Sequence, residues 1–350
     1  DVFQDITTGD NNSVIGYRAG YNITTGGNNT LIGHESGSSV STASYNTVIG
    51  ALAYDGSNAA NNTAIGYASL GGSVTGDNNT AVGYTALTAN TSGTRNTAVG
   101  ATALAAATTA DNNTAVGYTA LTANTTGASN VAVGYTALTA NTTGGLNIAT
   151  GAFSLATNTT GSDNTVSGGY AMNLNTTGGS NVAMGRSALR ANTTAANNTA
   201  IGYQALRYNT TGTSNVSVGK DSLLDNTTGG ANTAIGMLSL ANNTTADNNT
   251  AVGQSALTAN TTGHSNVGIG KDALVTNTTG AENNAFGLQA LYSNTTGSTN
   301  TALGRNTLYT NTTGTQNVAV GNNSLYQNTT ASNNVAVGYL ALTANTTGAE

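Results

Sequence analysis

Residues 113–127 read NTAVGYTALTANTTG, and close variants of this stretch recur along nearly the whole chain. Its glycine, Gly117, has counterparts at every seventeenth position from Gly16 to Gly338, apart from one shorter interval between Gly50 and Gly66. A fixed period of this length is typical of a solenoid, in which each repeat forms one coil and contacts its neighbours. The sequence therefore predicts about twenty stacked coils.

The composition favours a parallel β-solenoid. The 350 residues include 46 glycines and no proline, which suits strands that hydrogen-bond without interruption and turn at fixed points. Because cysteine is absent, disulfides and thiolate metal sites are excluded. We therefore expect an all-β fold, a single stack with one 17-residue coil per repeat, and no cofactor or metal.

Charge and histidine content exclude several classes of function. Charged residues make up 6% of the chain and the formal net charge is -6, so there is no basic surface for nucleic acid. No run of about 20 apolar residues occurs, so no membrane span is expected. The two histidines, His34 and His264, fall at different places in the repeat, and no catalytic constellation recurs. We expect a protein that is not an enzyme.

Asparagine stands four residues before the glycine in all twenty repeats. In coils about 4.8 Å apart, identical amide side chains hydrogen-bond to one another along the stack. The pattern therefore predicts a structural Asn ladder at one corner of the coil. Its central members are Asn113, Asn130, Asn147, Asn164, Asn181, Asn198, Asn215, Asn232 and Asn249.

Two apolar rows define the expected interior. In the strand before the glycine, as in Thr114-Ala115-Val116, large and small residues alternate, so they point to opposite faces. We place the Val/Ile row inward and the Ala row outward, where it would face solvent or another chain. Leucine follows the glycine by four residues in sixteen repeats, Leu121 among them, and predicts a second strand that also points inward.

A second corner begins seven residues after the glycine with Asn-Thr-Thr-Gly or Asn-Thr-Thr-Ala. Glycines such as Gly127 and Gly212 are expected there in a left-handed turn. The Asn-x-Thr pattern also matches the N-glycosylation acceptor, although a ladder of turn residues explains it without sugar. The candidate acceptors are Asn124, Asn141, Asn158, Asn175, Asn192, Asn209, Asn226, Asn243 and Asn260.

The segments NNSVIG (11–16) and SNVAVG (129–134) resemble the NSVAIG motif of YadA-like head domains in trimeric autotransporter adhesins. The whole repeat is also similar to repeats of bacterial and phage tail-fibre proteins. The resemblance implies a left-handed parallel β-roll that forms a homotrimer, lies at the cell surface or outside the cell, and binds host matrix or surface glycans. The repeat of this chain is longer than that of the YadA-like heads.

Three other binding functions remain open from the sequence. Stacked threonines such as Thr125 and Thr126 would suit an ice-binding face, although two consecutive side chains are expected to diverge. Tyrosines that follow the glycine, such as Tyr118, would bind glycans or pack across neighbouring coils. Scattered aspartates such as Asp77 and Asp111 would suit calcium only if they recurred in adjacent repeats, which they do not.

Residues 1–6 form a non-repeat segment, and residues 7–350 form the solenoid. Val2, Phe3 and Ile6 would then be a joining segment if coils stack head to tail into a filament. We expect an extracellular structural or adhesive fibre protein, either a homotrimer or a head-to-tail filament. The alternative is an ice-binding or glycan-binding solenoid that uses a Thr/Asn or Tyr face.

Overall fold

The computed structural model describes residues 7–56 and 58–348, and within them the chain forms three-residue strands joined by turns, with no helix. It consists of two compact units, Asp1–Thr177 (unit 1) and Gly178–Glu350 (unit 2), which are described separately. Val2, Phe3 and Ile6 lie outside the described residues, so the joining segment stays a prediction. In the described part of the chain, no helix is long and apolar enough to cross a membrane.

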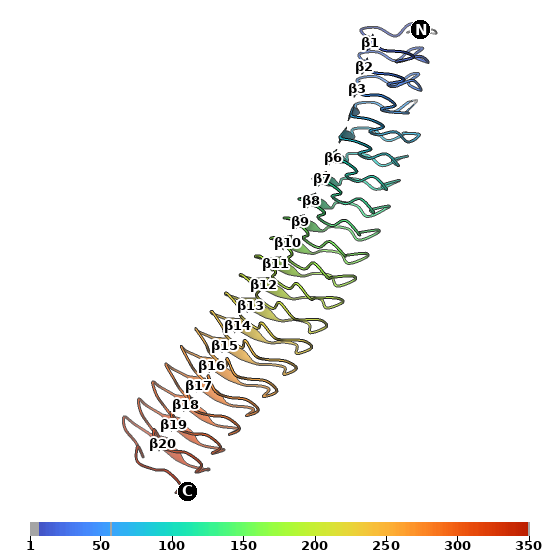
Figure 1. Cartoon of the computed structure of the whole chain (residues 1–350). Helices are drawn as coiled ribbons and strands as arrows, with labels where there is room; N and C mark the ends of the chain where they lie inside the picture. The colour runs from blue at the N-terminus through green and yellow to red at the C-terminus, as the bar shows by residue number, and fades with distance from the viewer. Residues whose placement is uncertain (1–6, 57, 349–350) are drawn as a thin grey trace. The chain divides into compact units, whose positions relative to one another are not determined.

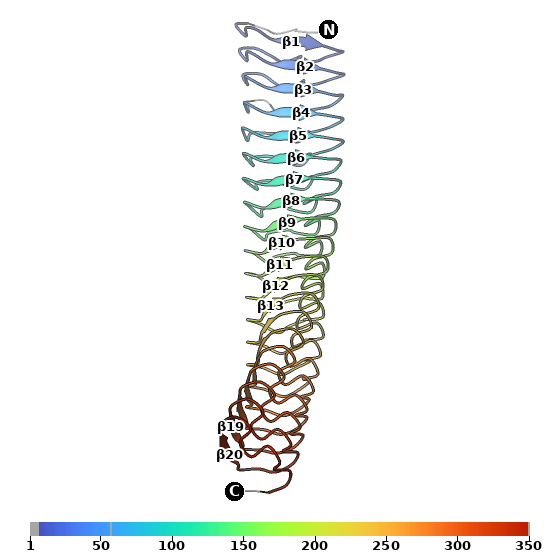
Figure 2. The same ribbon diagram turned by 90° about the vertical axis from the view of Figure 1, so that its left-hand side faces the viewer.

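Unit 1 has one strand in each coil, and each strand pairs in parallel with the next (Figures 1 and 2). Each strand residue pairs with its counterpart in the next repeat, and where the repeat is shorter, between β3 and β4, Thr47 still pairs with Thr63. The strands are β1 (Ser13–Ile15), β2 (Thr30–Ile32), β3 (Thr47–Ile49), β4 (Thr63–Ile65), β5 (Thr80–Val82), β6 (Thr97–Val99), β7 (Thr114–Val116), β8 (Val131–Val133), β9 (Ile148–Thr150) and β10 (Thr165–Ser167).

Unit 2 repeats this arrangement, with parallel pairing between equivalent residues of successive repeats throughout. Its strands are β11 (Val182–Met184), β12 (Thr199–Ile201), β13 (Val216–Val218), β14 (Thr233–Ile235), β15 (Thr250–Val252), β16 (Val267–Ile269), β17 (Asn284–Phe286), β18 (Thr301–Leu303), β19 (Val318–Val320) and β20 (Val335–Val337). The predicted parallel β-solenoid with one 17-residue coil per repeat is thus confirmed in each unit. The predicted left-handedness stays a prediction.

The orientation predicted for the strands was wrong. The middle alanine points inward and is fully buried, as at Ala115 and Ala132, whereas the flanking Val133 is 39% exposed. The reason is the leucine that follows the glycine: a Cβ at Gly268, a middle position, would lie 3.3 Å from Leu257 Cδ1. Leucine fills the interior, so the residue opposite it is alanine in most coils and no larger than valine, as at Val166. The Val/Ile row therefore lies on the outside.

Two coils with glycine in place of this leucine show the same complementarity in reverse. They carry Gly20 and Gly37 at the leucine position, and the middle strand residue between them is the larger, fully buried Leu31. A Cβ at either glycine would lie within 3 Å of a Leu31 methyl group. The volume of the interior is therefore held nearly constant while the large side chain changes its place in the coil.

The predicted second strand does not form, although the predicted inward leucine row is confirmed. Thr119 and Leu121 have φ angles of 52° and 55°, so the backbone after the glycine alternates into the left-handed region and cannot extend. Its N–H groups nevertheless bond neighbouring coils on both sides. Thr119 donates to Ala101 O (3.1 Å) and Leu121 donates to Ala137 O (3.0 Å).

The glycine of the repeat is required by both conformation and space. Gly117 has a φ of 138°, and a Cβ there would lie 2.3 Å from Gly134 O in the next coil. The left-handed conformation predicted for Gly127 and Gly212 is wrong, because the φ angles of these two glycines lie outside that region. At these positions the next coil passes close by, and the equivalent residue in some repeats is alanine, as at Ala110 and Ala246.

Candidate functional site

The predicted Asn ladder is present and buried. The backbone N–H of Asn130 donates to Asn113 Oδ1 (2.9 Å), and Asn130 Nδ2 donates to Gly144 O in the next coil (2.9 Å). The nine asparagines predicted for this ladder are at most 1% exposed. They hold one coil to the next and are not available as binding or catalytic groups.

The asparagines of the second corner form another ladder inside the coil. Asn141 Nδ2 donates to Asn124 Oδ1 (2.8 Å) and to Gly144 O (2.9 Å), the carbonyl that also accepts from Asn130. In a coil that carries both asparagines, the two ladders therefore meet at one carbonyl oxygen. The same convergence occurs in unit 2 at Gly229 O, which accepts from Asn215 and Asn226.

This geometry counts against the candidate glycosylation sites. A glycan would replace an Nδ2 proton of the ladder, and that nitrogen lies where the folded coil has no room for a sugar. The acceptor asparagines named from the sequence are all 0% exposed: Asn124, Asn141, Asn158, Asn175, Asn192, Asn209, Asn226, Asn243 and Asn260. In the folded chain the Asn-x-Thr pattern is a ladder motif.

The threonines of the second corner also serve the stack. Thr142 O accepts from the backbone N–H groups of Thr125 (3.0 Å), Thr126 (3.3 Å) and Gly127 (3.4 Å), and from Thr125 Oγ1 (3.1 Å). The Thr126 side chain is exposed, whereas Thr125 is half-buried. The two side chains diverge as predicted, so this corner presents no flat array of hydroxyls.

The scattered aspartates bond the backbone of the preceding coil. Asp111 Oδ1 accepts from Thr94 N (2.6 Å) and Thr94 Oγ1 (2.9 Å), Asp77 accepts from Ala60 N (2.7 Å), and Asp247 accepts from Gly230 N (2.6 Å). Within residues 7–56 and 58–348, no three His, Cys, Asp or Glu side chains are grouped so as to hold a metal ion.

The first and third residues of each strand form an outward surface, here called the strand face. None of the forty positions on it is charged. In unit 2 it exposes large apolar side chains, among them Met184 (43%), Ile235 (40%) and Leu303 (49%). In unit 1 its first row is threonine in six successive coils, and the hydroxyls of this row donate no hydrogen bond to described residues: Thr30, Thr47, Thr63, Thr80, Thr97 and Thr114.

Tyrosines at equivalent positions stack on one another. The rings of Tyr118 and Tyr135 lie 5.5 Å apart with an interplanar angle of 14°, and Tyr67 and Tyr84 form a similar pair. In unit 2, a different position of the repeat carries three stacked rings, Tyr292, Tyr309 and Tyr326, whose centroids are separated by 4.9 and 5.0 Å. A ring face that stacks on a neighbouring tyrosine is closed to a glycan, so the ring faces that remain for binding are those at the ends of each stack.

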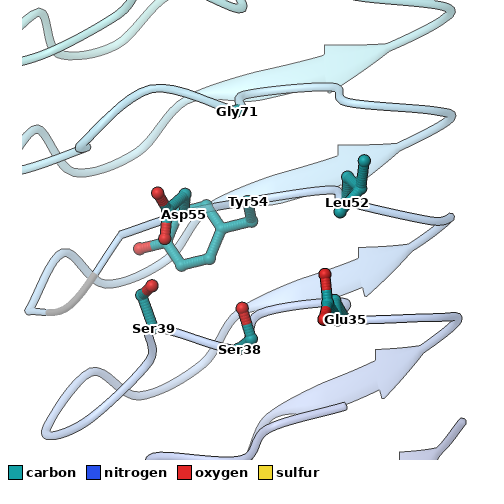
Figure 3. Close-up of a pocket in the computed structure, with 7 residues that line it drawn as sticks. All are labelled: Glu35, Ser38, Ser39, Leu52, Tyr54, Asp55 and Gly71. Atoms are coloured by element: carbon teal, nitrogen blue, oxygen red, sulfur yellow. The ribbon is translucent and has the colours of Figure 1, made fainter. Parts of the chain in front are cut away.

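The short coil of unit 1, between Gly50 and Gly66, borders an open polar hollow of about 360 Å³ (Figure 3). Two carboxylates from neighbouring coils line it, Glu35 and Asp55, together with Ser38 and Ser39. Glu35 lies 3.9 Å from Arg18 Nη1, an ion pair that partly neutralises it. The hollow offers hydrogen-bonding groups without a nucleophile and base in contact.

Tyr54 beside this hollow takes the place of an Asn of the second ladder. It occupies the leucine position, is 1% exposed, and its hydroxyl donates to Ala59 O, the carbonyl to which Asn46 Nδ2 also donates. Burial raises the pKa of Tyr54 to about 12. The sequence signal for this exception was the single shortened interval of the repeat. The interval alone does not indicate that a tyrosine hydroxyl replaces the asparagine amide.

A second hollow, of about 370 Å³, lies in unit 2 against the last ring of the tyrosine stack. It is lined by Asn306, Asn323, Tyr326, Gln327, Leu340 and Thr343. The sequence analysis missed these residues, although three tyrosines at one position of successive repeats were a visible signal.

No protein-family model matches the chain, and no curated protein matches it significantly. A functional assignment therefore depends on the strand face, the tyrosine stacks and the two hollows.

Proposed function

We propose that the chain is a structural and adhesive fibre module of the cell surface that associates with further copies of itself through the strand face. The observation that carries this proposal is the combination of a chargeless face with exposed Met184, Ile235 and Leu303. Contiguous apolar surface of this kind marks interaction sites in proteins. The resemblance to YadA-like heads favours a homotrimer over other assemblies.

The size of the strand face fits an interface between copies. Ten coils at roughly 4.8 Å each and a strip roughly 10 Å wide give about 500 Å² for each unit. When one unit contacts its counterpart in a second copy, each contributes about 500 Å². The total buried area is then about 1,000 Å², the lower limit for a specific interface. Matching coil spacing in the two copies lets the apolar rows interdigitate along the whole face.

Mass photometry and analytical ultracentrifugation of the full chain test the proposal. We expect concentration-dependent oligomers, with a trimer as the main species, and a monomer after the double substitution Ile235→Lys and Leu303→Lys. Thr262→Lys, at an exposed corner position, is the matched control and should leave the oligomer intact. A wild-type chain that stays monomeric at micromolar concentrations would show that the strand face is not a self-association surface.

The strand face of unit 1 favours a second candidate function, ice binding. Thr63, Thr80, Thr97 and Thr114 form a row whose hydroxyls make no bond within the described chain, next to a row of Ile and Val. In this second candidate function, the ice-binding surface would be the strand face and not the Thr125-Thr126 corner. An ice recrystallisation assay in which Thr97→Lys removes activity and Thr126→Lys preserves it would support this function, and an inactive wild-type chain would exclude it.

A further inference from the structure

The hollow in unit 2 at Tyr326 combines an aromatic platform with unpaired amides. Tyr326 stacks on Tyr309 with an interplanar angle of 3°, and Tyr309 stacks on Tyr292 with an angle of 10°. The equivalent residue in the next coil is Thr343, which is too short to continue the stack. The other face of the Tyr326 ring is therefore not covered by an aromatic side chain, and the ring is held in place by stacking on Tyr309.

The polar wall of the hollow comes from two asparagines in neighbouring coils. The side-chain amides of Asn306 and Asn323 make no hydrogen bond to any described residue, and both Oδ1 atoms are buried without a partner. Because neither Oδ1 atom is exposed, the groups that these side chains offer to a ligand are their Nδ2 N–H donors, which have no partner among the described residues. Gln327 adds a third neutral amide at the exposed rim.

All six lining residues are uncharged, which defines the ligand class. Hydroxyl oxygens that accept from amide N–H groups, and a C–H face that packs on an aromatic ring, occur together in a neutral pyranose. The volume of about 370 Å³ lies at the lower end of the range for small-molecule sites, roughly 300–1,000 Å³. One sugar ring is therefore a better match than a long oligosaccharide buried end to end.

We propose that this hollow is a binding site for a single neutral pyranose, which stacks on Tyr326 and accepts hydrogen bonds from Nδ2 of Asn306 and Asn323. This proposal names a ligand class for the adhesive part of the proposed function. It rests on the adhesive part and does not depend on self-association. None of its lining residues is a first or third strand residue, so binding is measurable whether or not the chains associate. Because the hollow is open, we expect a Kd on the order of 1 mM.

The test is saturation-transfer NMR and titration of the full chain with methyl β-glucoside, methyl β-galactoside and methyl α-mannoside. Glucuronic acid serves as the charged counterpart. We expect saturable binding of at least one neutral glycoside, and a loss of tenfold or more in Tyr326→Ala and Asn323→Ala. Thr343→Tyr should abolish binding as well, because a new ring would extend the stack over the Tyr326 face.

Thr343→Tyr separates the proposal from a general effect of exposed aromatic rings, since it adds a ring while it closes the site. Tyr292→Ala is the matched control: it removes a ring of the same stack that does not line the hollow, so it should keep wild-type affinity. Circular dichroism confirms that each variant is folded. Absence of binding by the wild type, equal binding by Thr343→Tyr, or stronger binding of glucuronic acid than of the neutral glycosides would overturn the inference.

Discussion

Within unit 1, the early and the later coils hold the second corner together by different means. Two of the early coils place a fully buried apolar residue there, Ile23 and Val40, and a third uses the Tyr54 hydroxyl. From Asn90 onward, asparagine takes this position in every coil of the unit except the one with Ala107. The strands and the first Asn ladder are the same in both regions. The second corner of the coil therefore accepts either an apolar or a polar side chain, here called its filling.

The difference lies in how each filling depends on its neighbours. An apolar side chain needs only packing partners, whereas a buried asparagine needs a donor from the next coil and an acceptor in the previous one. The coil with Ala107 shows the consequence. Asn90 Oδ1, which would accept from an asparagine at that position, is buried without a partner. A polar ladder is thus sensitive to the loss of a single member.

The largest effect is expected when a ladder asparagine is replaced by the apolar residue of the early coils. Asn141→Val would leave Asn124 Oδ1 without its donor, now at 2.8 Å, and Asn158 Nδ2 without one of its two acceptors. We expect a loss of about 2–4 kcal/mol in the free energy of unfolding. Urea denaturation and hydrogen exchange of the coils around residue 141 measure it.

The control for Asn141→Val is Thr143→Val, a change of similar size at an exposed position of the same corner. It should alter the free energy of unfolding by no more than about 0.5 kcal/mol. Equal stability of Asn141→Val and the wild type would mean that the two fillings are interchangeable in any coil.

The next effect concerns Tyr54 and alkaline pH. Its pKa is raised to about 12 in the folded chain, above the ordinary value of 10.0, so the unfolded chain loses this proton first. The stabilisation that depends on the neutral phenol is complete below pH 10 and disappears as the pH rises to 12, a loss of about 2–3 kcal/mol. The measurement is the difference in unfolding free energy between the wild type and Tyr54→Phe across that range.

Because the other tyrosines titrate in both proteins, only the difference between wild type and Tyr54→Phe reports on Tyr54. We expect the wild type to be more stable than Tyr54→Phe at pH 8, by about 1 kcal/mol for the hydrogen bond to Ala59 O, and to be less stable than Tyr54→Phe, by about 1–2 kcal/mol, near pH 12. A difference that stays constant with pH would show that the hydroxyl is not buried in solution.

Completing the ladder should stabilise the later coils. Ala107→Asn places an amide between Asn90 and Asn124, so that its Nδ2 donates to the orphaned Asn90 Oδ1 and its Oδ1 accepts from Asn124. We expect a gain of about 1–2 kcal/mol in unfolding free energy. Thermal and urea denaturation measure it, with Ala101→Asn as the control, at a position where another repeat carries Asn322. A less stable Ala107→Asn would mean that this coil has no room for the amide.

The repeat predicted the register, the first ladder and the inward leucines, because these depend on one position being the same in every coil. The direction of the strand could not be read from hydrophobicity, since alanine, valine and isoleucine are all apolar. Size complementarity was the available signal: Leu31 occupies a middle position only where Gly20 and Gly37 replace leucine. The prediction of a second strand was wrong because the left-handed φ angles at Thr119 and Leu121 have no sequence signature.

The candidate sites were harder to predict than the fold. The Asn-x-Thr motif looks the same whether its amide is exposed or buried, and only the shared carbonyl at Gly144 shows that Asn141 is used internally. The open face of Tyr326 depends on ring orientation and on the short Thr343. Neither can be read from the period of the repeat. The positions proposed to bind a ligand are departures from the repeat, whereas a repeat is recognised by what stays the same.

The smallest effect is expected at the corner threonine Thr125. Replacing it compares the contribution of a hydroxyl in the turn with that of an amide in the adjacent ladder. Thr125→Val removes the Oγ1 donor to Thr142 O, but that carbonyl keeps the three backbone N–H donors of Thr125, Thr126 and Gly127. No buried group loses its last partner, so we expect a change of less than about 1 kcal/mol in unfolding free energy. A loss as large as that of Asn141→Val, measured in the same urea titration, would mean that hydroxyls and amides contribute alike to the later coils, and that the contrast with the early coils does not rest on the asparagines.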